Sequence, residues 1–402
     1  MTKKRRPLRW KLGLTIVLGL AVIATWLIGG HRILEPSLRA ELAESIGIEP
    51  RIGFVLLGPD LNIYAYDVRF DAPGLRARVP WMKFEIPVQK LWGSGSTRAV
   101  HFRDLHAVVR EETDLSFIGS PKPDDRADER EQDADGGLRE LVGERVQIFL
   151  EQIEGDKLVP LLVTDRFEAR RLKRRSIAVE IGPGESGWVP FRGATMRVVP
   201  TPGHLIVSDF KLRAFGGLVG GLLDLHLEHA GRYNGEVEWH LFDIREICRT
   251  YAVPYAEKRR GKCAGRIRFH ASGPLLKQWR GSGEIRMHDA HFWSPITFKV
   301  FGVLGMPARQ ESWLHSGELG FTVENGLVYL ERGTLRGGEY VLDLQGIADL
   351  DGACDMELSY RGTTIAIRGT FDSPVVKILP LDAITLPFDR LFRTRLRERG
   401  QR

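Results

Sequence analysis

Cysteine is scarce in this chain of 402 residues, with only Cys248, Cys263 and Cys354. So few cysteines exclude a small disulfide-rich scaffold. Two alternatives stay open for them. Cys248 and Cys263, fifteen positions apart, can pair in an oxidising compartment, or all three are small buried apolar residues.

Motifs of the common enzyme classes are missing as well. The sequence contains no P-loop, no Gly-x-Ser-x-Gly elbow and no His-Glu-x-x-His helix, and Gly281-x-Gly283 lacks the third glycine of a dinucleotide fingerprint. Lys262 and Arg266 near Cys263 favour a lowered thiol pKa, but no base is placed beside it. We therefore predict that the chain is not an enzyme and needs no cofactor.

Three pairs of nearby histidines do not indicate a metal site in this sequence. His288 and His291 lie in a predicted strand, where residues three apart face opposite ways. The same holds for two further pairs, His101 with His106 and His226 with His229. We predict no metal site.

The net charge of +6 does not indicate nucleic-acid binding, because its distribution is uneven. Six cations precede residue 12 and account for all of it, and the tail 381–402 carries a further excess of three. The body between them is mildly acidic. Basic ends on such a body predict contact with lipid headgroups and no nucleic-acid partner.

An uncharged run from Leu12 to Gly30 follows those six cations. As a helix it spans about 28 Å, close to the thickness of the hydrocarbon layer. The positive-inside rule places the N-terminus in the cytoplasm and the body across the bacterial inner membrane, in the periplasm. Trp10 and Trp26 suit the two interfaces. The alternative is a cleaved signal peptide, since Val22 and Ala24 resemble the small residues before a cleavage site.

Residues 121–140 hold eight acids and four bases and read as a solvated linker or loop. Asp133, Asp135 and Gly136 resemble part of a calcium loop, but Val142 stands where the bidentate Glu is required. This excludes calcium.

Period-two alternation of apolar and polar residues dominates the rest and predicts strands. One predicted strand places Tyr64, Tyr66, Val68 and Phe70 on a single face. Others cover residues 100–109, with a bulge, 206–212, 223–227 and 237–241, the last after the turn signal Asn234-Gly235. Helical spacing predicts helices at 138–153, at 244–258 with a break at Pro254, and at 296–304.

The last hundred residues form a predicted meander of short strands joined by glycine turns. Strand patterns begin near residues 283, 319, 327, 340, 356, 365 and 376, with turns at Asn325-Gly326, Gly337-Gly338 and Asp351-Gly352.

Within this stretch several segments resemble, in order, the C-terminal domain of the AsmA-like family of bacterial envelope proteins. They are Gly281 to Ala290, the apolar segment near Val300-Phe301-Gly302, Leu319 to Leu330, Leu335 to Asp349, and Ile367-Arg-Gly-Thr-Phe-Asp-Ser-Pro-Val375. The resemblance covers about a hundred residues. It implies a long, curved, groove-like sheet with an apolar inner face, similar to chorein-type lipid-transfer proteins.

The predicted fold is therefore mainly β: a transmembrane helix, then a long curved antiparallel sheet or groove with a few packing helices. The expected organisation is a cytoplasmic tail 1–11, a membrane helix 12–30, a β-rich region 31–118, a charged linker 119–140, a central region 141–270, an AsmA-like domain 271–380 and a basic amphipathic tail 381–402.

The expected function is handling or transfer of phospholipid in envelope biogenesis and maintenance, with an outer-membrane or periplasmic assembly partner as a further candidate. The alternative is a membrane-tethered periplasmic scaffold that assembles envelope proteins and binds no lipid. Lipid-groove candidates are the apolar strand faces: Tyr64, Tyr66, Val68, Phe70, Phe321, Val323, Leu342, Leu344, Ile365 and Ile367.

Overall fold

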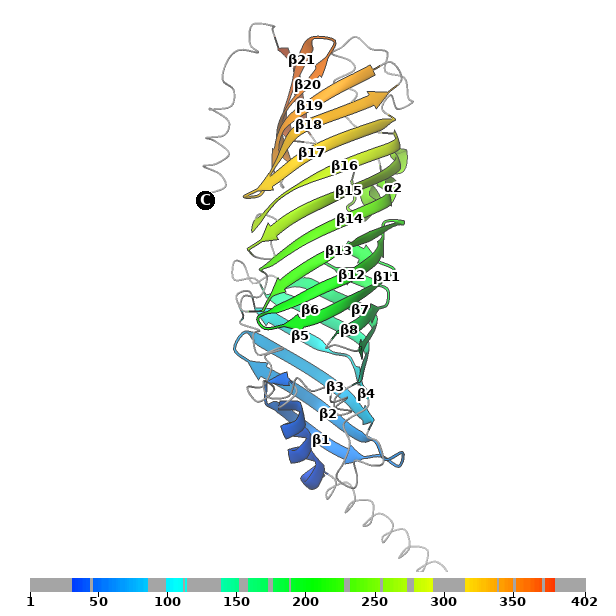
Figure 1. The fold of residues 1–402 in the computed structure, drawn as a ribbon, viewed down its shortest axis with the longest axis vertical. Coiled ribbons are helices and arrows are strands. Elements are labelled where there is room, and N and C mark those ends of the chain that lie inside the picture. Colours follow the sequence, from blue (N-terminus) through cyan, green and yellow to red (C-terminus); the bar gives the residue numbers. More distant parts are fainter. Residues whose placement is uncertain are drawn as a thin grey trace, which may run out of the picture. The chain divides into compact units, whose positions relative to one another are not determined.

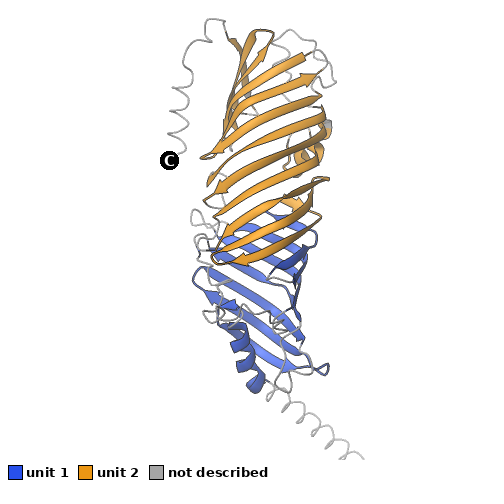
Figure 2. Ribbon diagram, in the orientation of Figure 1, with its two compact units in different colours: residues 1–188 blue, residues 189–402 orange. Residues whose placement is uncertain are grey.

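In the part of the chain that the computed structural model describes, most residues lie in strands, and the chain divides into two compact units, residues 1–188 and 189–402 (Figures 1 and 2). The described residues are 31–43, 46–85, 99–110, 113, 139–151, 158–172, 176–187, 189–227, 232–253, 256–272, 278–291, 315–337, 340–349, 352–370 and 373–379. The predicted mainly β class is confirmed.

The first unit is one sheet covered by a helix. Its strands are β1 (Pro50–Leu57), β2 (Ile63–Ala72), β3 (Leu75–Glu85), β4 (Ala99–Arg103), β5 (His106–Arg110), β6 (Glu140–Glu151), β7 (Leu158–Arg171), β8 (Ile177–Ile181) and β9 (Gly184–Ser186). Neighbours pair antiparallel, except that β4 and β5 both run parallel to β6.

A helix over residues 31–43 supplies the second layer of this unit (Figure 1). Leu38 and Leu42 are 3% and 7% exposed and join the same cluster as Val55 and Val68 of the sheet. Burying each of the two leucines contributes roughly 1.5–3 kcal/mol. The first unit thus has a closed core.

The second unit is an antiparallel meander in which successive strands, from residue 193 onward, lie side by side as a ladder (Figure 2). Its strands are β10 (Val189–Phe191), β11 (Gly193–Thr201), β12 (His204–Ala214), β13 (Gly217–His226), β14 (Tyr233–Asp243), β15 (Arg260–Ala271), β16 (Trp279–His291), β17 (Ser316–Glu324), β18 (Leu327–Gly337), β19 (Tyr340–Asp349), β20 (Ala353–Tyr360), β21 (Thr363–Thr370) and β22 (Pro374–Leu379).

A helical insertion connects β14 to β15, and the two strands still pair directly with each other. It consists of α2 (Ile244–Thr250) and the 3-10 turn η3 (Ala256–Lys258). Asp243 caps α2 by accepting a hydrogen bond from the Arg245 amide. The helix predicted from Ile244 is confirmed as far as Thr250, where α2 ends, and Pro254, the predicted break, lies outside the described residues.

Residues with left-handed backbone inside strands change which side chains face the core. Asp67 in β2 has φ 51°, and across it the buried positions pass from Ile63 and Ala65 to Val68 and Phe70. A single such residue advances the alternation by one position. The prediction that Tyr64 and Tyr66 share a face with Val68 and Phe70 is therefore wrong.

The helix predicted over 138–153 is also wrong, because Glu140–Glu151 form β6. Arg145 has φ 55°, so the buried positions Gly143, Val146 and Leu150 are three and four residues apart. A second irregularity lies between Ile148 and Phe149. The two irregularities thus space the apolar residues of this strand three and four positions apart, as in a helix.

The turn predicted at Asn234-Gly235 is wrong as well, since both residues lie within β14. The turns predicted in the C-terminal hundred residues are better placed. Asn325 and Gly326, with φ 54° and 76°, join β17 to β18, and Gly352, with φ 91°, precedes β20.

Several predicted segments lie outside the described residues: 1–11, 12–30, 296–304, 381–402 and most of the linker 119–140. Among the residues that are described, no helix combines the length and the apolar character needed to cross a membrane. The boundary between the units falls at residue 188, inside the predicted central region. Residues 270 and 271 both lie in β15, which pairs with β16 of the same ladder.

Candidate functional site

The ladder of the second unit has one polar face. Residues directly opposite each other on neighbouring strands form ion pairs there: Glu236 with Arg268 at 3.0 Å, Arg266 with Glu284 at 3.2 Å, and Asp355 with Arg368 at 3.2 Å. Such solvated pairs contribute at most about 1 kcal/mol each. They mark this face as the one turned to water.

The opposite face is apolar, and its side chains follow rows that cross the strands. In each row a large apolar residue is opposite a glycine of the next strand. The rows are Leu223–Gly235–Phe269–Gly281–Val323, then Val237–Ile267–Gly283–Phe321, and then Val219–Trp239–Gly265–Ile285–Leu319–Gly333–Leu344. We call these three rows the glycine-floored face.

The glycines let the neighbouring side chains lie flat on the sheet. A Cβ placed on Gly265 would lie 2.4 Å from Cζ2 of Trp239, and one on Gly283 would lie 2.6 Å from Cζ of Phe321. At Gly235 both Leu223 and Phe269 would be 2.7 Å away. Because real contacts are longer, these positions exclude any side chain. The strand backbone is thereby covered by its neighbours' rings and methyl groups.

Most large side chains of the glycine-floored face are half-buried rather than buried. Among them are Leu223, Val237, Trp239, Ile267, Ile285, Leu319, Phe321, Val323 and Leu344. In the core of the first unit, by contrast, Val55 and Val68 are 0% exposed. A contiguous, partly exposed apolar surface of this kind is a candidate binding site for a ligand or partner.

Two side-chain clusters overlap the glycine-floored face: Phe269 belongs to one, and Trp239, Ile285 and Leu319 pack against the other. In the first, Tyr233, Phe269 and Trp279 pack together, with the Phe269 and Trp279 rings stacked at 4.5 Å. Burial raises the pKa of Tyr233 to about 12, so it stays neutral. In the second, Ile244 and Cys248 of α2 pack on Cys263 and Met287. These clusters hold the surface in place independently of any ligand.

One stability prediction follows from the close approach at Gly283. Gly283→Ala places a methyl group against Phe321 and the Arg266 carbonyl, and we expect a loss of about 1–3 kcal/mol in the free energy of unfolding. Gly320→Ala in β17 is the matched control, because its Cβ meets nothing closer than 3.7 Å. Urea denaturation measures both. Equal losses in the two variants would contradict the flat packing.

The sequence-predicted groove residues are divided among four environments. Phe321, Val323 and Leu344 lie on the glycine-floored face, while Leu342, Ile365 and Ile367 are 1%, 0% and 2% exposed in a buried cluster of β19–β21 against which Leu344 packs. Val68 and Phe70 belong to the core of the first unit. Tyr64 and Tyr66 lie on that sheet's other face.

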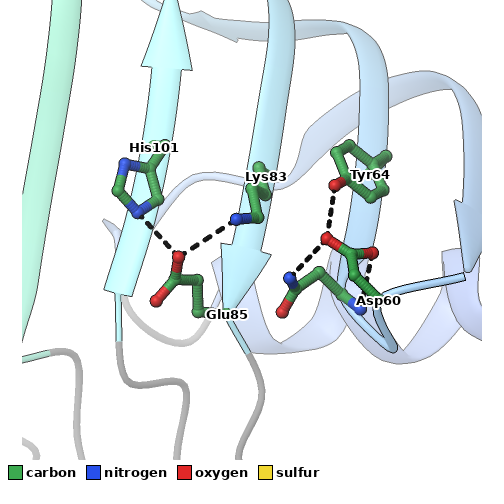
Figure 3. A network of polar contacts seen from close by, with 6 residues as sticks. Asp60, Tyr64, Lys83, Glu85 and His101 are labelled. Carbon is green, nitrogen blue, oxygen red and sulfur yellow. Dashed lines mark hydrogen bonds and ion pairs between the residues drawn. The ribbon is translucent and has the colours of Figure 1, made fainter. Parts of the chain in front are cut away.

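Tyr64 belongs to a polar surface network (Figure 3). Its hydroxyl donates to Oδ2 of Asp60 at 2.7 Å, and this bond raises the pKa of Tyr64 to about 12. On the neighbouring strands, Oε1 of Glu85 accepts from Lys83 and contacts Nε2 of His101, both at 3.1 Å. Tyr64 is thus oriented by a hydrogen bond. His101 and His106 have different partners, because the His106 ring packs on Phe149 with the ring centroids 5.4 Å apart.

The three cysteines are buried free thiols. Burial raises the pKa of Cys263, contrary to the lowering that its basic neighbours suggest. Lys262 instead donates to Oδ2 of Asp243 at 3.0 Å. This environment gives no activated nucleophile, and Cys248 and Cys263 both serve as small apolar residues of the α2 cluster.

Sequence reasoning missed eight large members of the glycine-floored face: Val219, Leu223, Val237, Trp239, Ile267, Phe269, Ile285 and Leu319. Five of them were placed in predicted strands without a binding role, and Val219, Ile267 and Phe269 were assigned to no element. All except Val219 lie opposite a glycine of a neighbouring strand, a signal that can be recognised only once the register is known.

Comparisons of the chain with protein-family models, with curated proteins and with solved structures give no match.

Proposed function

We propose that this protein is an inner-membrane-anchored periplasmic protein that holds and transfers phospholipid in envelope biogenesis and maintenance. The observation that carries the proposal is the glycine-floored face, a half-buried apolar surface on a ladder whose other face bears ion pairs. An apolar surface of this kind is stabilised by contact with acyl chains, which remove it from water.

The arrangement of the rows supports an acyl ligand over a folded partner. The rows cross successive strands, so they run along the ladder rather than along one strand. Each strand adds about 4.8 Å to such a row. Since the glycines remove projecting side chains, the surface offers long, shallow tracks that match the shape of extended hydrocarbon.

The basic residues before position 12 and the uncharged run 12–30 support the membrane anchor and its orientation. The resemblance of residues 281–375 to the AsmA-like family supports the envelope setting. In this proposal the anchor keeps the β-rich body beside its lipid source.

Site-specific photo-crosslinking in cells tests the proposal against the scaffold alternative. A photoreactive residue replaces Ile267 in the full chain, and Arg268 is the matched control, one position along β15 on the polar face. We expect a phospholipid adduct by mass spectrometry at position 267 and none at 268. A protein adduct at 267 with no lipid would overturn lipid handling and favour the scaffold.

A further inference from the structure

The polar face of the second unit carries a cluster that has no part in lipid contact. His204 of β12 is directly opposite His226 of β13, and Asp224 lies two residues before His226, on the same face of that strand. One side-chain nitrogen or oxygen from each of the three lies within 4.8 Å of the others. Nδ1 of His204 is 2.9 Å from Oδ1 of Asp224, and the two imidazole rings are 4.4 Å apart.

A second set of polar residues surrounds this trio. Nδ2 of Asn234 on β14 lies 3.2 Å from Nε2 of His226, and Oδ1 of Asn234 also contacts Nδ1 of His270 on β15.

An open hollow of about 620 Å³ adjoins the trio. Asp224, Asn234 and His270 line it together with Arg268 and Arg280. Asp224 thus links the imidazole pair to an open space that can admit a hydrated ion and keep a water molecule beside it.

We propose that His204, Asp224 and His226 form a binding site for a divalent transition-metal ion, with Zn²⁺ as the representative ion. Two imidazoles and one carboxylate are a donor set that suits such ions, and three protein ligands leave one position for water. Ligand atoms in a tetrahedral site are about 3.3 Å apart, given bonds of about 2.0–2.1 Å. The His204–Asp224 contact, at 2.9 Å, is already close to this separation, and the His226 nitrogen lies within 4.8 Å of both.

Isothermal titration of the purified full chain with Zn²⁺ tests the site. The wild type should bind one tight equivalent, and His226→Gln should weaken binding at least tenfold. His240→Gln, an exposed histidine of β14, is the control and should bind as the wild type does. Asp224→Asn should also weaken binding and serves as a second variant if His226→Gln does not fold, which urea denaturation monitors.

Electron paramagnetic resonance with Cu²⁺ gives a readout that a merely structural role would not change. Nuclear couplings should report two imidazole nitrogens in the wild type and one in His204→Gln or His226→Gln. No saturable Zn²⁺ binding by the wild type, or an unchanged affinity in the folded His226→Gln variant, would overturn the proposal.

Discussion

Phe321→Asp should abolish most of the protein's capacity to take up phospholipid. The side chain lies half-buried on the glycine-floored face, against Gly283 and beside Ile267 in its row. Bringing an acyl chain against a carboxylate removes that charge from water, which costs several kcal/mol. Because about 1.4 kcal/mol corresponds to a factor of ten, uptake should fall at least tenfold. Transfer of a fluorescent phospholipid from donor vesicles to the full chain measures it.

Thr322→Asp is the matched control for this result. It adds the same charge one residue further along β17, on the polar face, where Thr322 donates to Glu331. Uptake by this variant should stay within about twofold of the wild type. Equal loss in both variants, or normal uptake by Phe321→Asp, would show that lipid does not contact the glycine-floored face.

Ile365→Ala should produce the largest loss of stability among single truncations in β19–β22. Ile365 is 0% exposed and packs with Leu342, Leu358 and Ile367 in one cluster. Removing its side chain leaves a cavity, and truncations of this kind cost about 2–5 kcal/mol. Chemical denaturation, followed by a spectroscopic probe in the second unit, measures the change.

Val375→Ala on β22 is the corresponding control, because that side chain is 52% exposed and should change stability by less than about 0.5 kcal/mol. Lipid uptake by the folded Ile365→Ala variant should remain near normal. A variant that keeps full stability but loses uptake would return Ile365 to the list of lipid-contacting residues.

The C-terminal meander was predictable because residue types typical of tight turns stand between its strands. Asn325 and Gly326 adopt the left-handed backbone that a tight hairpin needs, and alternation is regular on both sides. In β6 the same kind of reasoning failed, since Arg145 has a left-handed backbone that nothing in its residue type announces. The turn predicted at Asn234-Gly235 was wrong for a different reason: Gly235 lies within a strand, where its missing side chain leaves room for Phe269 and Leu223.

The functional surfaces were only partly predictable because both depend on register. Phe321 and Val323 were identified from alternation alone, but the glycine opposite each large side chain is dozens of residues away in some rows. The metal-site trio shows the same limit. His226 was considered with His229, its neighbour in sequence, whereas the structure pairs it with His204 across two strands.

Native mass spectrometry of the full chain, released from detergent micelles, tests the central claim most directly. If the glycine-floored face holds acyl chains, the wild type should retain phospholipid adducts that Phe321→Asp lacks and Thr322→Asp keeps. A wild-type spectrum without phospholipid adducts, from protein that remains folded and was supplied with lipid, would contradict it.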